Sequence, residues 1–560
     1  MNIMIQLPIF FTIYILFFIS AIGYGLIFFN ITKIKLIDNN IAIYSLFGLI
    51  FLTFISYLTI LILPHNIYFN LILHFIGVLS FYKKKKLFDY SNITILIIIV
   101  IFVGLIISKN HDDFPFYHFQ TSLNFSQNKI QLGMSNLNFA YAHHSSLLYL
   151  NSLFYIPVYK FYFFNVPNII FYTSIILLFI KNCFNKKDDS FLRFYSLFAV
   201  VYFLVKFSRL SEFGTDVVGQ CLIILFLYYN CKILFFEKNN KNLILLAGLL
   251  LCYCLTLKTY FVLYFLFYFY LIFKIKLSNF FIIIRKYYIF FIYSVILVFL
   301  FLLMNLLTSG CLIYPLSFLC FEGLSWAMPI SEVKEYKLWY EVWAKSVAGA
   351  GYVTDDFFSV IKNFRWVEHW FKEYFIGKMT DNLLIFLLLT LIFLGTFWPK
   401  IKKKQTLKIN SIYGLIFFTL VLLVFWFLKH PQIRYGGYPI FFLMFCLPTS
   451  YFLSLGKLNI KELNKSFKFL IIISLSVFLI KNTIRINLEF ERNDMYKFTN
   501  FPFFSIPNDL IFEKKIVDDV VTVYKTVNNN CWNAPSPCPY SSNVRAKKKL
   551  GFVIFYNDKK

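Results

Sequence analysis

The stretch that decides the fold is NITILIIIVIFVGLII, residues 92–107, which contains no Asp, Glu, Lys or Arg. Such a run is typical of a helix that crosses a lipid bilayer, since a span needs about 17–25 mostly apolar residues. The chain leaves this run through SKNHDDFPFYHFQ, residues 108–120, which sets two carboxylates between two histidines. The first stretch predicts a membrane protein, and the second raises the question of what such polar groups do at a membrane exit.

Composition extends the membrane interpretation to the whole chain of 560 residues. Hydrophobic residues make up 59%, charged residues 14%, and the mean hydropathy is +0.69, whereas soluble domains are about 45–50% apolar and about 25% charged. We expect an all-α polytopic membrane protein with about 12–14 transmembrane helices. The apolar runs lie near residues 8–29, 41–63, 67–82, 92–108, 166–181, 191–207, 217–236, 243–257, 259–274, 287–308, 383–398, 411–428, 436–455 and 467–481.

Basic residues in the short loops predict the orientation of these spans. Lys83–Lys86, the KIKKK stretch at 400–404 and several other lysine-rich loops fall on one side, which should be cytoplasmic. The outer side then receives the loops 109–165 and 309–382, the tail 482–560, and both termini. This gives a transmembrane domain over 1–481 and an extracytoplasmic tail domain over 482–560, which we expect to form a small α/β element.

The predicted alternation of cytoplasmic and outer loops holds only if one apolar segment does not cross the membrane. Residues 145–164, SSLLYLNSLFYIPVYKFYFF, are apolar enough to cross, but a crossing there would invert every loop downstream. We therefore expect a re-entrant or surface-lying helix. The tryptophan-rich part of 309–382 is expected to form amphipathic helices on the membrane surface, which either roof a substrate groove or are only structural.

The net charge of +27 does not indicate a nucleic-acid-binding protein. The basic residues lie between apolar runs, where they orient a membrane protein, and no motif for nucleic acid stands out. We therefore expect membrane lipids as partners and no nucleic acid.

Two cysteine pairs lie on the predicted outer side. Cys311 and Cys320 belong to SGCLIYPLSFLCF, and Cys531 and Cys538 to CWNAPSPC. Outer loops are oxidising, so two local disulfides are expected. Pairing as zinc ligands remains an alternative, although neither pair has the usual two-residue spacing or nearby histidines.

The outer loop after residue 108 is unusually rich in ionisable and polar side chains. It holds four of the eight histidines of the chain, with two aspartates among them. The functional interpretation is a site in which one acid accepts a proton from a hydroxyl group while His or Tyr positions an anionic group. An ordinary interfacial loop and a divalent-metal site are the alternatives. The candidate residues are His111, Asp112, Asp113, Tyr117, His118, Asn136, His143 and His144.

Two further outer stretches offer groups that complete a site. SRLSEFGTDVVGQ supplies Arg209 and Asp216, and KHPQIRYGGYPIFF supplies Lys429 and Arg434. Arg offers a planar fork of donors to a phosphate and Lys a point charge. Positive charge at a helix end is the structural alternative for each of them.

This layout resembles the GT-C class of membrane glycosyltransferases, which take a sugar from a polyprenyl-phosphate carrier. In that class a large outer loop opens with acidic residues and continues through short surface helices, while later outer loops bring basic residues to the lipid phosphate. Here HDDFPFYH, SSLLYLNSLFY and KHPQIRYGGY match these elements. The acidic pair departs from the pattern, because it follows the fourth predicted span and not the first.

The resemblance implies an enzyme that transfers a sugar to a glycan, lipid or protein acceptor on the outer face. Asp113 would be the general base, with Asp112 in support or bound to a divalent metal. Lys429 and Arg434 would hold the carrier phosphate. The remaining candidates for substrate binding are Tyr117, His118, Asn136, His144, Arg209 and Asp216.

The chain is also similar to an uncharacterised family of bacterial multi-pass membrane proteins. The shared features are an acid followed by Tyr-His, GMSNL-like and HSS-like stretches, and a Cys-Trp…Pro-Cys tail, here Gly133–Leu137, His144–Ser146 and Cys531–Cys538. This similarity implies the bacterial inner membrane as the location and adds no activity. A transporter or flippase for lipid-linked glycans and a non-enzymatic envelope assembly protein are the competing functions.

Overall fold

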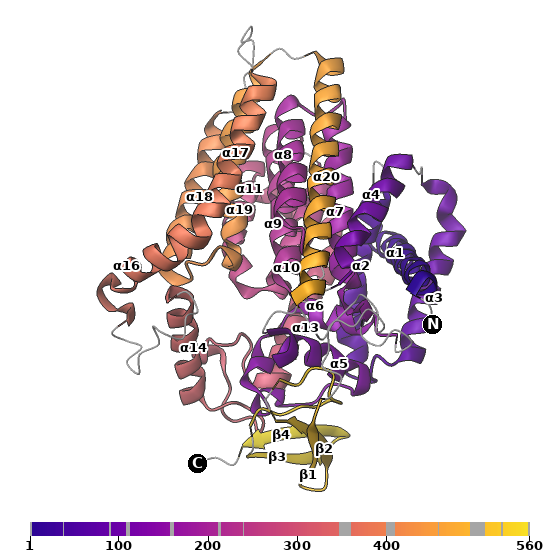
Figure 1. Ribbon diagram of the computed structural model, residues 1–560, viewed down its shortest axis with the longest axis vertical. Coiled ribbons are helices and arrows are strands. Elements are labelled where there is room, and N and C mark those ends of the chain that lie inside the picture. The colour runs from indigo at the N-terminus through magenta and orange to yellow at the C-terminus, as the bar shows by residue number, and fades with distance from the viewer. Residues whose placement is uncertain are drawn as a thin grey trace.

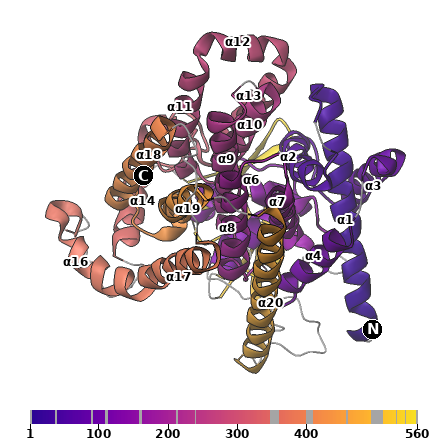
Figure 2. The same ribbon diagram turned by 90° about the horizontal axis from the view of Figure 1, so that it is seen from above.

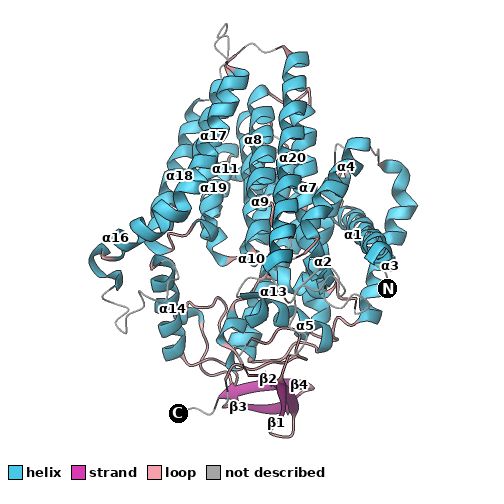
Figure 3. Cartoon of the chain, in the orientation of Figure 1, coloured by secondary structure: helices cyan, strands magenta, loops and turns pink. Residues whose placement is uncertain are grey.

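The structure, a computed structural model, describes residues 3–36, 39–88, 91–107, 113–156, 162–210, 214–238, 240–346, 360–398, 409–456, 459–492, 510–527, 530–541 and 543–557. Helices dominate the molecule, and strands occur only at one end of it (Figure 3). His111 and Asp112, two of the candidate site residues, lie outside the described residues.

Long helices form most of the chain and follow the predicted apolar runs. They are α1 (Ile3–Thr32), α2 (Ile41–Ile60), α3 (Ile67–Lys84), α4 (Asn92–Phe102), α7 (Val166–Phe184), α8 (Ser190–Lys206), α9 (Asp216–Phe235), α10 (Lys241–Leu257), α11 (Phe265–Ile275), α12 (Leu277–Lys286), α13 (Tyr288–Ser309), α17 (Thr380–Phe397), α18 (Ile409–Lys429), α19 (Tyr438–Ser454) and α20 (Ile460–Arg492). Within the described residues nine helical segments are long and apolar enough to cross a membrane, or ten if a bent pair counts as one span.

This count is lower than the expected 12–14 spans, because several predicted spans form helices shorter than 18 residues. Helices α8 and α10 have 17 residues each and α4 has 11. At about 1.5 Å per residue, 17 residues cover about 26 Å, less than the hydrocarbon core of about 30 Å. The run 259–274 lies in the helical segment Thr259–Ile275, and the chain bends by 100° after this segment into α12.

The helices form a bundle with a buried centre and a lipid-facing periphery (Figures 1 and 2). The apolar window that contains α7 is 100% buried and that of α9 is 89% buried, whereas the windows of α17 and α18 are each 28% buried. In Figure 2, α8 and α9 lie at the middle of the projection while α3, α12 and α16 (Trp366–Trp370) lie at its edge. Helices such as α7 are apolar on all sides because other helices surround them.

The predicted outer segments pack together as one cap at the lower end of the bundle in Figure 1. Leu132 N donates to Val553 O at 2.9 Å, and Phe555 N donates to Leu132 O at 2.8 Å. Gly133 N donates to Leu307 O at 2.9 Å, which ties the same loop to the end of α13. Residues from 113–156, 309–346 and 510–557 therefore share one end of the bundle, as the loop charges predict.

Basic loops meet at the other end of the bundle. Asn242, near the start of α10, donates from Nδ2 to Lys35 O at 2.7 Å. The end of α17 and the start of α20 also lie at this upper end (Figure 1). The relative sides of the loops thus agree with the alternation read from the lysines.

The segment 145–164 is not a surface-lying helix. Within its described residues, α6 (Ser146–Ser152) is seven residues long and every one of them is buried. Ser56 donates to Tyr149 O at 2.8 Å and Ser122 donates to Leu148 O at 3.0 Å, so hydroxyls of α2 and α5 (Phe119–Gln127) hold it inside the cap. Polar neighbours and its short length keep α6 from crossing.

The tail contains two β-hairpins where an α/β element was expected, and no helix occurs in its described residues from 510 onward. Strand β1 (Phe512–Val517) pairs with β2 (Val521–Thr526), and β3 (Val544–Lys549) pairs with β4 (Phe552–Asn557), both antiparallel. Asp518 and Asp519 have φ of 47° and 53°, values that Asp tolerates in tight turns. Helix α20 runs to Arg492, beyond the expected domain boundary at 481.

Candidate functional site

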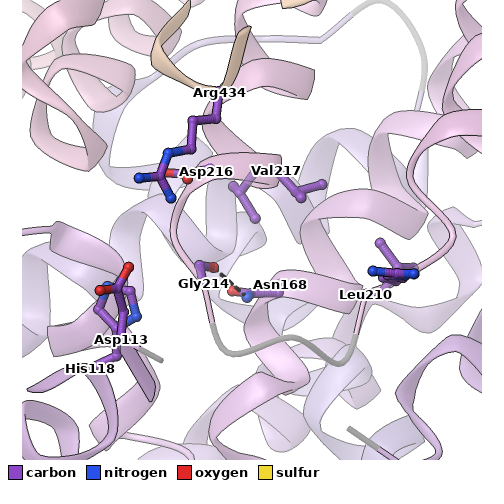
Figure 4. Close-up of a pocket in the computed structure, with 10 residues that line it drawn as sticks. Asp113, His118, Asn168, Leu210, Gly214, Asp216, Val217 and Arg434 are labelled. Carbon is purple, nitrogen blue, oxygen red and sulfur yellow. Dashed lines mark hydrogen bonds between the residues drawn. The ribbon is translucent and has the colours of Figure 1, made fainter. Parts of the chain in front are cut away.

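A cavity of about 100 Å³ lies between the helical bundle and the cap (Figure 4). Figure 4 shows Asp113 and His118 on one wall and Arg434 with Asp216 on another. Several water molecules fit into a cavity of this size. We call it the acid–arginine cavity, and its lining residues are Asp113, His118, Asn168, Arg209, Leu210, Gly214, Asp216, Val217, Val218 and Arg434.

Asp113 and His118 are placed by one π-helical turn, η3 (Phe114–His118), which precedes α5. Phe119 N donates to Phe114 O, so residues five apart in sequence lie one above the other. Pro115 fits at the start of this turn, where its missing N–H leaves no helical acceptor unsatisfied. Turns of this kind occur often at functional sites, and this one brings the carboxylate and the imidazole to the same cavity.

Asp216 comes from the first position of α9 and pairs with Lys258, the residue that follows α10. Lys258 Nζ lies 3.2 Å from Asp216 Oδ1, and the two side chains are 25% and 32% exposed. Asn168, near the start of α7, donates from Nδ2 to Gly214 O at 3.1 Å, which holds the chain just before α9. Its Oδ1 atom is buried and has no hydrogen-bond partner among the described residues.

Arg434 is held in a kinked segment, η13 (Ile433–Gly437), between α18 and α19. Its guanidinium carbon lies 4.6 Å from the centroid of the Trp343 ring, and Nη2 donates to the Tyr435 hydroxyl at 3.0 Å. Its Nε is buried and has no hydrogen-bond partner among the described residues. The stacked guanidinium therefore keeps donors available for an anion in the cavity.

The backbone of this segment is fixed by contacts that need a glycine. Gln220 Nε2 and the Tyr260 hydroxyl donate to Arg434 O at 2.7 and 3.0 Å. Gly436 has φ of +80°, and a Cβ there would meet the Tyr260 ring at 3.1 Å. The glycine in RYGGY thus permits a close backbone approach that sets the direction of Arg434.

A second, smaller cavity of about 60 Å³ adjoins the first, and His118 lines both. We call it the histidine–tyrosine cavity, and its lining residues are Tyr117, His118, His143, His144, Ser145, Leu148, Thr215, Lys258, Thr259, Asn305 and Tyr314. The roof of this region comes from α14 (Ile330–Lys345), the described part of the expected tryptophan-rich surface helices. Trp343 of α14 stacks on Arg434, and the Tyr340 ring lies 4.6 Å from that of His143.

Burial governs the protonation of the groups around the second cavity. It lowers the pKa of His143 to about 3, and the neighbouring charge of Lys258 lowers it further while that of Asp113 opposes this. Burial and the adjacent His143 lower the pKa of His144 to about 3. The pKa of Tyr117 is raised well above its ordinary value by burial and by the negative charges of Asp113 and Asp216. Both histidines and this tyrosine are therefore neutral at pH 7.

Most of the predicted site residues meet at these two cavities. Asp113, His118, Arg209, Asp216 and Arg434 line the first. Tyr117 and His144 line the second, but both ring nitrogens of His144 are already engaged, Nε2 with Thr308 Oγ1 and Nδ1 with the Tyr149 hydroxyl.

Asn136 and Lys429 line neither cavity. Asn136 donates from Nδ2 to the backbone carbonyls of Gly133, Trp326 and Phe555, so it joins three parts of the cap. The Lys429 side chain is 67% exposed, with Nζ 4.0 Å from Glu341 Oε1. Asp112 lies outside the described residues.

Sequence reasoning missed several residues of the site. Lys258, Asn168, Thr215 and Tyr314 were not among the candidates, although each lines a cavity. Lys258 carried the clearest signal, since it is a lone cation between two apolar runs in CLTLKTYFV. The others are single polar residues at helix ends or in loops, where such residues are common.

The described residues contain no group of three or more His, Cys, Asp or Glu side chains arranged for a metal ion. Both expected disulfides are present and confirmed. Cys311 pairs with Cys320 and Cys531 with Cys538, with Cα atoms 3.9 and 6.0 Å apart. The second bridge closes the loop that supports the Asp113 segment: Trp532 N donates to Pro115 O at 3.1 Å.

Comparison with known proteins places the chain in a family without naming a reaction. No curated protein and no solved structure matches it. Residues 7–442 match a family described as a domain of unknown function, DUF8201. That match covers all of the residues that line the two cavities, so the site lies within the family's own region. The chain belongs to the DUF8201 family.

Proposed function

We propose that this protein is a GT-C-type glycosyltransferase that moves a sugar from a polyprenyl-phosphate carrier to a hydroxyl group of a glycan, lipid or protein. The observation that carries the proposal is the meeting of Asp113 with two arginines, Arg209 and Arg434, in a single cavity at the end of the helical bundle. The second carboxylate of this cavity, Asp216, is paired with Lys258 at 3.2 Å. A base and an anion site within one small cavity are what such a transfer needs.

The chemistry assigns a role to each side of the cavity. Asp113 accepts the proton of the acceptor hydroxyl while the oxygen of that hydroxyl bonds to the anomeric carbon of the donor sugar. The bond from that carbon to the carrier phosphate breaks, and the departing phosphate takes the electron pair. Arg434 and Arg209 stabilise the negative charge that gathers on the phosphate oxygens.

The apolar part of the lining suits a lipid carrier. Leu210, Val217 and Val218 share the cavity with the two arginines. An amphiphilic ligand whose phosphate lies against the arginines would place its chain along these side chains. Membrane lipids and a lipid-linked sugar are the partners that this arrangement favours.

The proposed location is the outer face of a bacterial inner membrane, with both termini on that side. The warrant is the excess of basic residues in the loops at the opposite end. A membrane-impermeant maleimide should label Gln127→Cys in the cap of intact cells and leave Lys85→Cys unlabelled. Labelling of Lys85→Cys but not of Gln127→Cys would show that the protein has the opposite orientation.

The decisive experiment compares Asp113→Asn with the wild-type protein in nanodiscs supplied with radiolabelled polyprenyl-phosphate sugars and an extract of acceptors. Removal of the base should lower the transfer rate by at least about 100-fold. Asp519→Asn, in an exposed turn of the tail, is the matched control and should transfer normally.

Two results would decide against the enzyme. Transfer by Asp113→Asn at the wild-type rate would show that this carboxylate is not the general base. Movement of the intact lipid-linked sugar between leaflets, without a new glycosidic bond, would favour the transporter alternative.

A further inference from the structure

We propose that the histidine–tyrosine cavity is a binding subsite for an uncharged sugar ring, an inference that rests on the proposed glycosyl transfer for the class of its ligand. The cavity adjoins the acid–arginine cavity, and His118 lines both. A ligand whose sugar lies in one and whose phosphate lies in the other would have its anomeric carbon close to His118.

The lining of this cavity is polar but carries little charge. Ser145 and Thr259 supply hydroxyl groups, Asn305 supplies an amide, and histidines supply imidazole groups. No carboxylate of the described residues lines this cavity. Its one lysine, Lys258, is paired with Asp216 at 3.2 Å. The arginines lie in the other cavity, so the two cavities divide anion binding from the binding of neutral hydroxyl groups.

Buried hydroxyls in this lining are left without protein partners. Ser145 Oγ and Thr215 Oγ1 are buried and make no hydrogen bond with the described residues. Leaving such buried groups unsatisfied is unfavourable, so a polar ligand or water is expected to satisfy them. Ser145 is informative because it begins α6 without making the side-chain cap that Ser normally supplies there.

Aromatic rings enclose the same space. The His143 ring lies 5.2 Å from that of Tyr314 and 6.3 Å from that of Tyr117. The buried Tyr314 hydroxyl forms no hydrogen bond with the described residues. Sugar rings present C–H faces and hydroxyl edges, and a lining that offers flat apolar rings beside unpaired polar atoms matches both.

His144 lines this cavity in an orientation that is set by the protein. Both of its ring nitrogens are hydrogen-bonded, to Thr308 and to Tyr149, so its orientation is set by the protein and not by a ligand. The hydroxyls of Ser145, Thr215 and Tyr314 make no hydrogen bond with the described residues and are available to a ligand.

The test uses direct binding, so it does not require transfer activity. Methyl glycosides of glucose, galactose, mannose and N-acetylglucosamine are titrated onto the wild-type protein in nanodiscs by saturation-transfer NMR, with glucuronic acid as the charged counterpart. Inorganic pyrophosphate, followed by isothermal titration calorimetry, is the probe for the acid–arginine cavity. At least one uncharged glycoside should bind. Ser145→Ala and Tyr314→Phe should each weaken it by about threefold to tenfold, the effect of one lost neutral hydrogen bond.

Controls separate the subsite from general damage. Ser325→Ala and Tyr413→Phe make the same chemical changes at exposed positions and should bind the glycoside normally. Pyrophosphate binding should be unchanged in Ser145→Ala and Tyr314→Phe and lost in Arg434→Gln. Absence of glycoside binding, or equal binding by all variants, would overturn the subsite.

The outcomes also separate the two proposals. If the protein transfers no sugar but binds a glycoside in a way that depends on Ser145 and Tyr314, the proposed transferase activity is contradicted and the proposed sugar subsite is supported. If transfer is measurable, a higher KM for the lipid-linked donor alone in these variants assigns the subsite to the donor sugar. A higher KM for the acceptor alone assigns it to the acceptor sugar.

Discussion

Lys258 Nζ lies 3.2 Å from Asp216 Oδ1, and this ion pair joins the two cavities, because Asp216 lines the first and Lys258 lines the second. Asp216 is the first residue of α9, and Lys258 directly follows the last residue of α10. The pair therefore locks two helix ends together at the point where a phosphate and a sugar are proposed to meet.

Breaking this pair from one side should destabilise the protein. Asp216→Asn leaves Lys258 without its nearest negative charge, and removal of one partner of a fully buried pair costs about 3–5 kcal/mol. Partial exposure reduces this, so we expect about 1–3 kcal/mol. Thermal unfolding of Asp216→Asn, Lys258→Met and the double variant would measure the coupling, and additive losses would contradict it.

Arg434 and Lys429 should differ sharply, although they lie five residues apart in one predicted basic element. Arg434→Gln should raise the KM for the lipid-linked donor at least about tenfold, as expected for a charge-assisted contact with phosphate. Lys429→Gln should change it less than about twofold, since the lysine is 67% exposed and lines neither cavity. Similar KM values for both variants would remove the assigned role of Arg434.

Hydropathy and loop charge predicted the helix positions and the shared side of the outer segments because both signals are local. A run such as 217–236 needs no partner to be recognised, and α9 (Asp216–Phe235) agrees with it. The number of helices with at least 18 residues is lower than the predicted number of spans because α8 and α10 are apolar but have 17 residues each. Burial inside the protein makes such helices as apolar as a lipid-facing span.

The site was predicted as a set of residue types but not as an arrangement. Loop sides placed Asp113 and Arg434 on one face of the membrane, yet nothing local indicated that they line the same cavity. Lys258 and Asn168 were missed because a single polar residue at a helix end has an ordinary structural explanation. The tail hairpins were not predicted, because they contact each other through residues far apart in sequence, such as Asp518 and Arg545, whose charged groups lie 2.9 Å apart.

Stability should fall as the medium becomes acidic, and buried histidines give the reason. Burial lowers the pKa of His65 to about 3, and its nitrogens bond to Thr59 Oγ1 at 2.9 Å and Ser152 Oγ at 2.6 Å. The unfolded chain binds a proton at His65 below about pH 6.5, whereas the native form resists protonation until about pH 3.

The free energy of unfolding is therefore greatest above about pH 6.5 and decreases as the pH falls from there toward 3. His143 and His144, whose pKa values are also lowered to about 3, act in the same direction. Thermal unfolding between pH 7.5 and 5.0 should show this decline, and His65→Gln should make it shallower. An unchanged slope in His65→Gln would contradict a neutral, buried His65.

The disulfide Cys531–Cys538 is predicted to support the turn that carries Asp113 more directly than Cys311–Cys320 does. Its loop donates from Trp532 N to Pro115 O at 3.1 Å. Gln120 Nε2 donates back to Trp532 O at 2.9 Å and Ala534 O at 2.7 Å. Pro115 and Gln120 lie on either side of His118, so the tail loop fixes the turn that carries Asp113 and His118.

Replacing both cysteines of this loop by serine should cost about 2–3 kcal/mol of stability through the freed unfolded chain, and it should also lower kcat because the turn is less well held. Cys311→Ser with Cys320→Ser is the matched control: it removes a bridge of similar size, whose Cα atoms are 3.9 Å apart, and should affect stability more than kcat. Both Cys531 and Cys538 are at most 1% exposed, so the native protein should keep this bridge under mild reductant. Normal kcat in the Cys531→Ser/Cys538→Ser variant, at a temperature where it is folded, would show that the tail does not position Asp113.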